Sequence, residues 1–115
     1  FGIGSLSARL PSRVYSGGFL DPDEITHAQE DGVVGDVCTV LLREDGSTDM
    51  DLNKRASGPS PATLRKIPRR LAVVAGASKA LPLLGALHAG VITDLVLDDG
   101  AARELLDLVR HRAHA

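Results

Sequence analysis

A regular alternation of strand and helix patterns over residues 71–110 is the feature that most constrains the fold of this chain. The apolar run Leu71–Ala75 has the length and content of a buried strand. A helical pattern follows over residues 78–87, where Pro82 is tolerable only in the first turn. A second strand pattern at Leu95–Leu97 precedes a final helix to about Arg110, which Asp98 or Asp99 caps. Two strands separated by one helix pair in parallel through a right-handed crossover. The pattern therefore predicts an α/β fold with a mainly parallel sheet flanked by helices.

A helix is also predicted to begin in the acidic stretch that follows Leu20. Asp21 can accept hydrogen bonds from N–H groups of the first turn, and Pro22 fits that turn because its missing N–H would have no partner there. We expect this helix to run to Glu30 and to stop near Gly32.

Residues 33–42 form an apolar run that predicts a single buried strand. The Asp45-Gly46 pair is typical of a turn, so residues 47–52 are expected to return as a short strand. A polar loop follows, and Ser60 opens a short helix that ends before Pro68.

Composition and charge limit the classes of function. The formal net charge is -2, whereas a chain that grips DNA needs clustered positive charge. The basic run Arg65, Lys66, Arg69 and Arg70 is interpreted as a solvated helix end. No stretch approaches the roughly 20 apolar residues that span a membrane, and the histidines lack the spacing of metal ligands. We expect a cytoplasmic protein with no membrane partner, no metal and no cofactor.

The turn between the strand at 71–75 and the next helix is the strongest candidate for a binding site. Exposed N–H groups and the helix dipole make such a turn attractive to anions, and ligands of open parallel sheets bind beyond the carboxyl ends of the strands. Gly76, Ala77 and Ser78 would supply N–H groups, and Lys79 a positive charge that can reach a phosphate. The alternative is an ordinary strand–turn–helix with a solvated lysine.

Three further groups of residues could contact a ligand. Asp36 lies between apolar residues, where a carboxylate must hydrogen-bond to ligand hydroxyls or to protein backbone. Asn53 could hold ligand hydroxyls, as Asp36 could, and Arg55 has a planar guanidinium that suits phosphate. Gly2 and Gly4 could present N–H groups, and Ser5 a hydroxyl, to a polar ligand. The alternatives are a structural Asp, a surface loop and a turn at the chain end.

These stretches occur in the order in which they are found in a known family. The matching stretches are Gly2-Ile3-Gly4, Gly18-Phe19-Leu20, residues 32–38, Asn53-Lys54-Arg55, residues 64–68, residues 74–79 and residues 84–96. Over nearly its whole length the chain resembles the sugar-binding effector domain of SorC/DeoR-type bacterial transcription regulators. It departs from the family pattern at Ala77 and at Thr39, where the family usually or often has glycine.

The resemblance implies a fold like that of the sugar-phosphate isomerases and deaminases. Residues 1–115 would then be the C-terminal portion of an effector domain, and the DNA-binding helix-turn-helix would lie outside this chain. A start at Phe1 rather than at Met leads us to expect a piece of a longer protein.

The implied effector is a phosphorylated sugar, and the implied state is a homo-oligomer. By resemblance Lys79 contacts the phosphate, Asp36 and Arg55 lie in or near the pocket, and Gly2 and Gly4 lie at its edge. The chain would be a sensor rather than an enzyme. Two alternatives remain: an isomerase- or deaminase-like enzyme with Asp36 as its base, and an oligomerisation fragment that binds no ligand.

Overall fold

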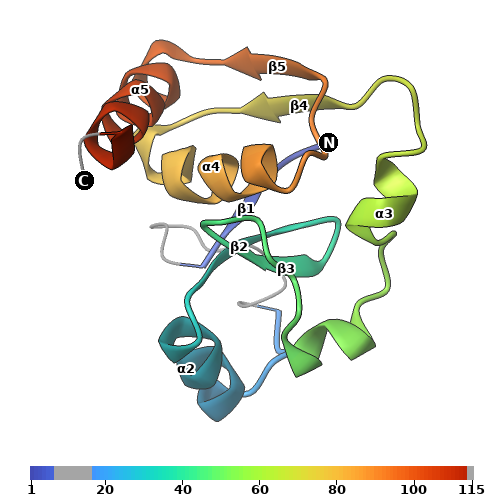
Figure 1. Cartoon of the computed structure of the whole chain (residues 1–115). Coiled ribbons are helices and arrows are strands. Elements are labelled where there is room, and N and C mark those ends of the chain that lie inside the picture. Colours follow the sequence, from blue (N-terminus) through green and yellow to red (C-terminus); the bar gives the residue numbers. More distant parts are fainter. Residues whose placement is uncertain (7–16, 114–115) are drawn as a thin grey trace.

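Two small β-sheets with a helix between them form the framework of the computed structural model, which describes residues 1–6 and 17–113 (Figure 1). One sheet contains the antiparallel strands β1 (Gly4–Ser5), β2 (Val33–Val37) and β3 (Val40–Arg43), in that order. The other pairs β4 (Leu71–Val74) with β5 (Asp94–Leu97) in parallel. The fold is therefore mixed α/β. In the described part of the chain the larger sheet is antiparallel, so the expectation of a mainly parallel sheet is met only at β4 and β5.

The backbone of Phe1 extends the parallel sheet on the other edge of β4. Its amino group donates to the carbonyl oxygen of Leu71 at 2.8 Å, and its carbonyl oxygen accepts from the N–H of Val73 at 3.0 Å. One residue that bonds to both neighbours of Ala72 in this way has the hydrogen-bond pattern of a parallel ladder.

Helix α4 (Ala80–His88) is buried on two sides because it lies between the sheets (Figure 1). A Cβ atom at Gly85 would lie 2.6 Å from the carbonyl oxygen of Arg43, so the helix backbone rests directly on β3. Pro82 occupies the first turn, as predicted, where it interrupts no helical hydrogen bond. A helix that is apolar on nearly all sides is typical of a layer enclosed by two others.

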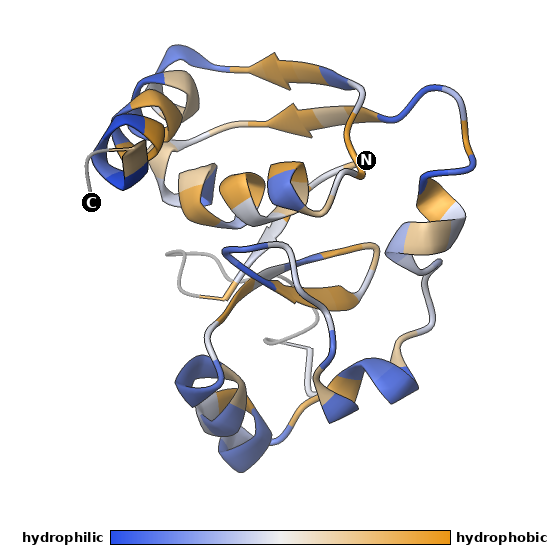
Figure 2. Ribbon diagram, in the orientation of Figure 1, coloured by the Kyte–Doolittle hydropathy of each residue, from blue (hydrophilic) through white to orange (hydrophobic). Residues whose placement is uncertain are grey.

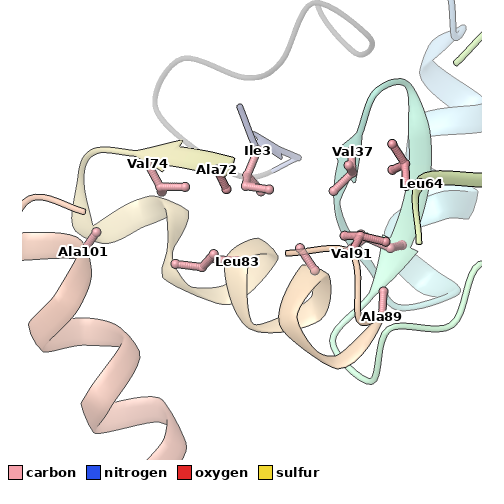
Figure 3. Packing of buried hydrophobic residues seen from close by; sticks show 11 residues of the cluster. Ile3, Val37, Leu64, Ala72, Val74, Leu83, Ala89, Val91 and Ala101 are labelled. Carbon is pink, nitrogen blue, oxygen red and sulfur yellow. The ribbon is translucent and has the colours of Figure 1, made fainter. Parts of the chain in front are cut away.

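Two clusters of buried side chains hold the layers together. The main cluster lies around α4 and consists of Ile3, Val37, Leu42, Leu64, Ala72, Val74, Leu83, Ala86, Ala89, Val91 and Ala101 (Figure 3). The second lies between the antiparallel sheet and α2 (Pro22–Glu30) and consists of Leu6, Leu20, Ala28, Val33, Leu41 and Met50. The antiparallel sheet therefore buries apolar residues on both faces.

The predicted helix starts are confirmed. Asp21 and Glu24 form a capping box at the start of α2, with the Glu24 N–H 2.8 Å from the Asp21 carboxylate. Ser60 caps α3 (Pro61–Leu64), and the carboxylate of Asp98 accepts from the N–H of Ala101 in α5 (Asp99–Ala113).

The basic run Arg65, Lys66, Arg69 and Arg70 was expected to be a solvated helix end and loop, but two of its arginines are structural. Arg65 Nε donates to the carbonyl oxygen of Ala89 and Arg70 Nε to that of Val91, each at 3.1 Å. These carbonyls follow the C-terminus of α4, where a positive charge is favoured by the helix dipole.

Residues 33–42 do not form the single predicted strand but the hairpin of β2 and β3. Its turn residues, Cys38 and Thr39, have φ angles of 50° and 73°. Two consecutive positive φ angles are usually supplied by Asn-Gly or a similar pair, so Cys-Thr gave no turn signal. Gly58 packs on this turn: a Cβ there would lie 1.7 Å from the carbonyl oxygen of Cys38.

The predicted strand at residues 47–52 is also wrong. The chain is irregular after the turn at Gly46 and then forms the 3-10 helix η1 (Asp51–Arg55). The outer edge of β3 is covered by a side chain, that of Asn53, rather than by another strand.

The face of the β4–β5 sheet that points away from α4 is apolar and exposed. Leu71, Val73 and Val96 are 47%, 56% and 52% exposed, whereas Ala72 and Val74 on the opposite face are buried. Figure 2 shows both strands in the orange of apolar residues. The strands predicted to be buried are therefore buried on one face only. Within residues 1–6 and 17–113, no helix has the length and apolar content needed to cross a membrane.

Candidate functional site

The turn after β4 leaves two backbone N–H groups without an acceptor. Gly76 has a φ of 97°, in the region that favours glycine, and the 3-10 helix η2 (Ala77–Lys79) leads directly into α4. Lys79 N donates to Gly76 O at 3.1 Å. The N–H groups of Ala77 and Ser78 precede any possible helical acceptor, and they make no hydrogen bond within the part of the chain that the structure describes.

Lys79 connects this turn to β1. Its Nζ atom donates to the carbonyl oxygen of Ile3 at 2.8 Å. The next residue, Gly4, is paired with Asp36 across the β1–β2 ladder. Strand β1 therefore brings together three predicted site residues that are far apart in the sequence.

Asp36 is a nearly buried carboxylate, with 6% of the residue exposed. Its neighbour Gly35 faces Pro82 of α4. Because side chains alternate along a strand, Asp36 points to the opposite face of the sheet, which it shares with its cross-strand partner Leu41. A hollow of about 240 Å³ is lined on this face by Phe19, Leu20, Thr39, Leu41, Leu52, Arg55, Ala56 and Ser57.

Asn53 and Arg55 lie on η1, beside β3. Their hydrogen bonds and ion pair join them to residues other than Lys79. The side-chain oxygen of Asn53 accepts from Leu41 N at 2.7 Å, and its amino group donates to the carbonyl oxygens of Leu41 and Thr48, both at 2.8 Å. Arg55 forms an ion pair of 2.9 Å with Glu24. Both side chains thus have protein partners, and Arg55 also lines the hollow on the Asp36 face.

Of the first five residues, Gly2 is approachable and Ser5 is buried. A Cβ at Gly2 would meet nothing within 4 Å, so its backbone is approachable. Ser5, whose hydroxyl was considered as a further ligand contact, is fully buried, and its Oγ has no hydrogen-bond partner among the described residues.

Sequence reasoning predicted Asp98 as a possible helix cap but missed its contact with the turn. Its two carboxylate oxygens lie 3.1 and 3.0 Å from Gly76 N, and Oδ1 also accepts from Ala101 N at 2.9 Å. The N–H groups of Ala101 and Gly76 hold the pKa of this carboxyl below its ordinary value. Asp98 directly follows β5, so its position beyond the carboxyl end of the neighbouring parallel strand was the signal that could have found it.

Within the part of the chain that the structure describes, the ionisable side chains do not form a metal centre. In residues 1–6 and 17–113, no three His, Cys, Asp or Glu side chains are grouped so that they could hold a metal ion. The site can therefore be described as a turn with free N–H groups, a lysine and a nearly buried carboxylate on neighbouring elements.

Sequence comparison connects this arrangement with transcription regulators. Residues 1–107 match the family described as "Putative sugar-binding domain". The chain is 34% identical over 90 residues to the uncharacterized transcriptional regulator YjhU of Escherichia coli K12, an alignment that covers 77% of this chain and 27% of that protein.

Solved structures share the fold. A domain of a possible sugar-binding transcriptional regulator from Arthrobacter aurescens TC1 is 48% identical with a TM-score of 0.81, over 92% of this chain and 40% of that one. The full-length sorbitol operon regulator SorC from Klebsiella pneumoniae is 27% identical with a TM-score of 0.77, over 91% and 34%. The chain thus spans less than half the length of these relatives.

Proposed function

The chain belongs to this family of sugar-binding domains of transcription regulators, and from that premise we propose that it senses a phosphorylated sugar for a DNA-binding regulator. Residues 1–115 would be the C-terminal portion of the effector domain, and DNA would be bound by a helix-turn-helix outside them. Such a regulator would act in the cytoplasm. The chain itself would bind and not catalyse.

The observation that carries this proposal is the grouping of the Gly76–Lys79 turn with Asp36 through β1. The phosphate would accept hydrogen bonds from Ala77 N and Ser78 N and would be neutralised by Lys79, whose Nζ already lies at Ile3 O. Asp36 would accept hydrogen bonds from sugar hydroxyls. Gly2 and Gly4 would border the sugar.

The residues of η1 have a supporting place in this proposal. Asn53 would hold β3 behind Asp36, since the oxygen and the nitrogen of its side-chain amide both bond to the backbone of Leu41. Arg55 could offer a ligand those N–H groups that its ion pair of 2.9 Å with Glu24 does not use.

Effector binding would regulate DNA binding through differential affinity. A ligand shifts a protein between two arrangements only if it binds one of them more tightly. Homo-oligomerisation belongs to the same proposal, and the exposed apolar face at Leu71, Val73 and Val96 supports it. Sedimentation velocity at two protein concentrations tests it: Val73→Ser should weaken association, and an unchanged monomer fraction would count against this face.

Thermal stabilisation by a panel of sugar phosphates tests the sensing function. The parent sugars and inorganic phosphate are the controls, and the full-length regulator is measured beside the 115-residue chain. A ligand at 100 times its dissociation constant should add about 2.7 kcal/mol of stability. Stabilisation that requires both sugar and phosphate supports the proposal, and failure of every sugar phosphate on the full-length regulator contradicts it.

The enzymatic alternative makes a different prediction. An isomerase or deaminase would need a general base near the sugar carbon, and Asp36 is the carboxylate best placed for this. Turnover of a sugar phosphate that is lost in Asp36→Asn would favour the enzyme over the sensor. The fact that the matched relatives are transcription regulators supports the sensor.

A further inference from the structure

A carboxylate of the protein already occupies part of the turn that is proposed to bind phosphate. Both oxygens of Asp98 lie within hydrogen-bond distance of Gly76 N, at 3.1 and 3.0 Å. The same carboxylate caps α5 through Ala101 N at 2.9 Å. An ideal Cβ at Gly100 would lie 3.9 Å from Ala77 N, so the first turn of α5 stands against the start of η2.

This position has two consequences for an anion at the turn. Asp98 accepts the hydrogen bond of the Gly76 N–H. A ligand can therefore use only the N–H groups of Ala77 and Ser78 and the ammonium group of Lys79. The charge of Asp98 also repels a phosphate bound a few ångströms away, since like charges at short range disfavour each other. Both effects weaken the binding of any anion that has no further contact.

We infer that Asp98 sets the anion affinity of the Gly76–Lys79 turn: it weakens the binding of every phosphate there, so that only phosphate esters held also through their hydroxyls bind tightly. This inference rests on the proposed function. A sugar phosphate recovers the lost affinity through contacts at Asp36, whereas inorganic phosphate cannot. The carboxylate thus keeps the affinity for inorganic phosphate low, while the contacts of the sugar keep the effector bound.

Asp98→Asn tests this role with little change in shape. Asparagine is as good a helix cap as aspartate, so α5 keeps its start while the negative charge is removed. The control is Asp99→Asn, the same change one residue further on, where the carboxylate lies 3.4 Å from Arg103 in an exposed ion pair. Inorganic phosphate is titrated into all three proteins, and the amide resonances of Ala77 and Ser78 are followed by NMR.

The expected result is that Asp98→Asn binds inorganic phosphate about fivefold more tightly at low ionic strength, with the gain shrinking in 0.5 M salt as charges are screened. The wild type and Asp99→Asn should bind it alike. The affinity of Asp98→Asn for a sugar phosphate should rise by a similar factor, because the same negative charge is removed from beside the same phosphate group. Equal phosphate affinity in Asp98→Asn and the wild type, or an equal gain in Asp99→Asn, would overturn the inference.

The same titration separates this inference from the function on which it rests. If a sugar phosphate shifts Ala77 and Ser78 in the wild type but Asp98→Asn shows no gain for inorganic phosphate, the sensor stands and the role of Asp98 falls. If no phosphate compound shifts these amides in any of the three proteins, the turn is not an anion site and both proposals fall.

Discussion

The Nζ atom of Lys79 donates a hydrogen bond to the carbonyl oxygen of Ile3 at 2.8 Å, across 76 positions of the sequence. This contact orders a side chain that is otherwise long and flexible. An ammonium group has three donors, so two remain for a ligand. A lysine that is already held in place loses less conformational entropy when a phosphate binds, which favours affinity.

Lys79→Met should abolish stabilisation by sugar phosphates and change the unliganded protein little. Methionine keeps the length of the side chain and removes its charge, and the lost hydrogen bond to Ile3 should cost about 1 kcal/mol of unfolding free energy. Thermal unfolding with and without ligand measures both effects. Lys54→Met, at a lysine whose side chain is 81% exposed, is the matched control. Undiminished stabilisation of Lys79→Met would remove the lysine from the site.

Asp36→Asn should separate recognition of the sugar from recognition of the phosphate. Asparagine has nearly the same shape, but it accepts weaker hydrogen bonds than a carboxylate does. Bonds to a charged group contribute about 1.5–3 kcal/mol, so we expect at least a tenfold loss in sugar-phosphate affinity by calorimetry. Asp107→Asn, on the exposed side of α5, should bind normally. A sugar-phosphate affinity that is the same in Asp36→Asn and the wild type would show that this carboxylate is structural.

The last third of the fold could be predicted because its signals are local. The strand at Leu71, the cap at Asp98 and the proline in the first turn of α4 each follow from neighbouring residues. The hairpin at Cys38 and Thr39 could not be predicted in this way, because neither residue favours a positive φ angle and the turn packs on Gly58, which is distant in sequence.

The candidate site, too, could be predicted only where its sequence signal is local. The turn at Gly76–Lys79 was found from a strand followed by a helix, which is a local pattern. The sequence did not reveal that Asn53 bonds to Leu41, or that Asp98 bonds to Gly76, because each pairing depends on how separate elements pack. Arg55 was grouped with the site by its chemistry, and its pairing with Glu24 became visible only in three dimensions.

Asn53→Ala should destabilise the protein by about 1–3 kcal/mol, the usual effect of leaving partly buried backbone groups without partners. The N–H and the carbonyl of Leu41 would both lose their partner, and β3 would have an open edge. Chemical denaturation measures the change. Lys54→Ala removes an exposed neighbour on the same 3-10 helix and should be nearly neutral. Equal stabilities of Asn53→Ala and Lys54→Ala would contradict the role of Asn53 in holding the edge of β3.

Acid should destabilise the protein as its depressed carboxyl groups are protonated. The hydrogen bond from Arg112 holds the pKa of Glu44 below its ordinary 4.5, and that from Arg43 holds the pKa of Asp49 below 3.8. Below these ordinary values the unfolded chain binds more protons than the folded one, so this stability is present above about pH 4.5 and is lost as the pH falls through the lower folded values.

Glu44→Gln should flatten the upper part of this pH dependence and cost less than about 1 kcal/mol near neutrality, because its pair with Arg112 is partly exposed. Unfolding free energies between about pH 7 and pH 3 measure both effects. Glu104→Gln makes the same change of charge on an exposed part of α5 and should leave the slope as it is in the wild type. If both variants kept the wild-type slope, Arg112 would not hold Glu44 in its charged form.

Gly58→Ala should be the most damaging of these substitutions. The added Cβ would lie 1.7 Å from the carbonyl oxygen of Cys38, and the N–H of Gly58 now donates to Thr39 Oγ1 at 3.0 Å. A clash between a Cβ and a backbone atom cannot be relieved by a rotamer change, so the hairpin turn must move. Overpacking of this kind costs about 1–3 kcal/mol or more. Gly2→Ala is the matched control, because a Cβ there meets nothing within 4 Å. A melting temperature lowered by several degrees in Gly58→Ala alone is expected. Equal melting temperatures would mean that the turn at Cys38 and Thr39 moves away from the added Cβ without cost.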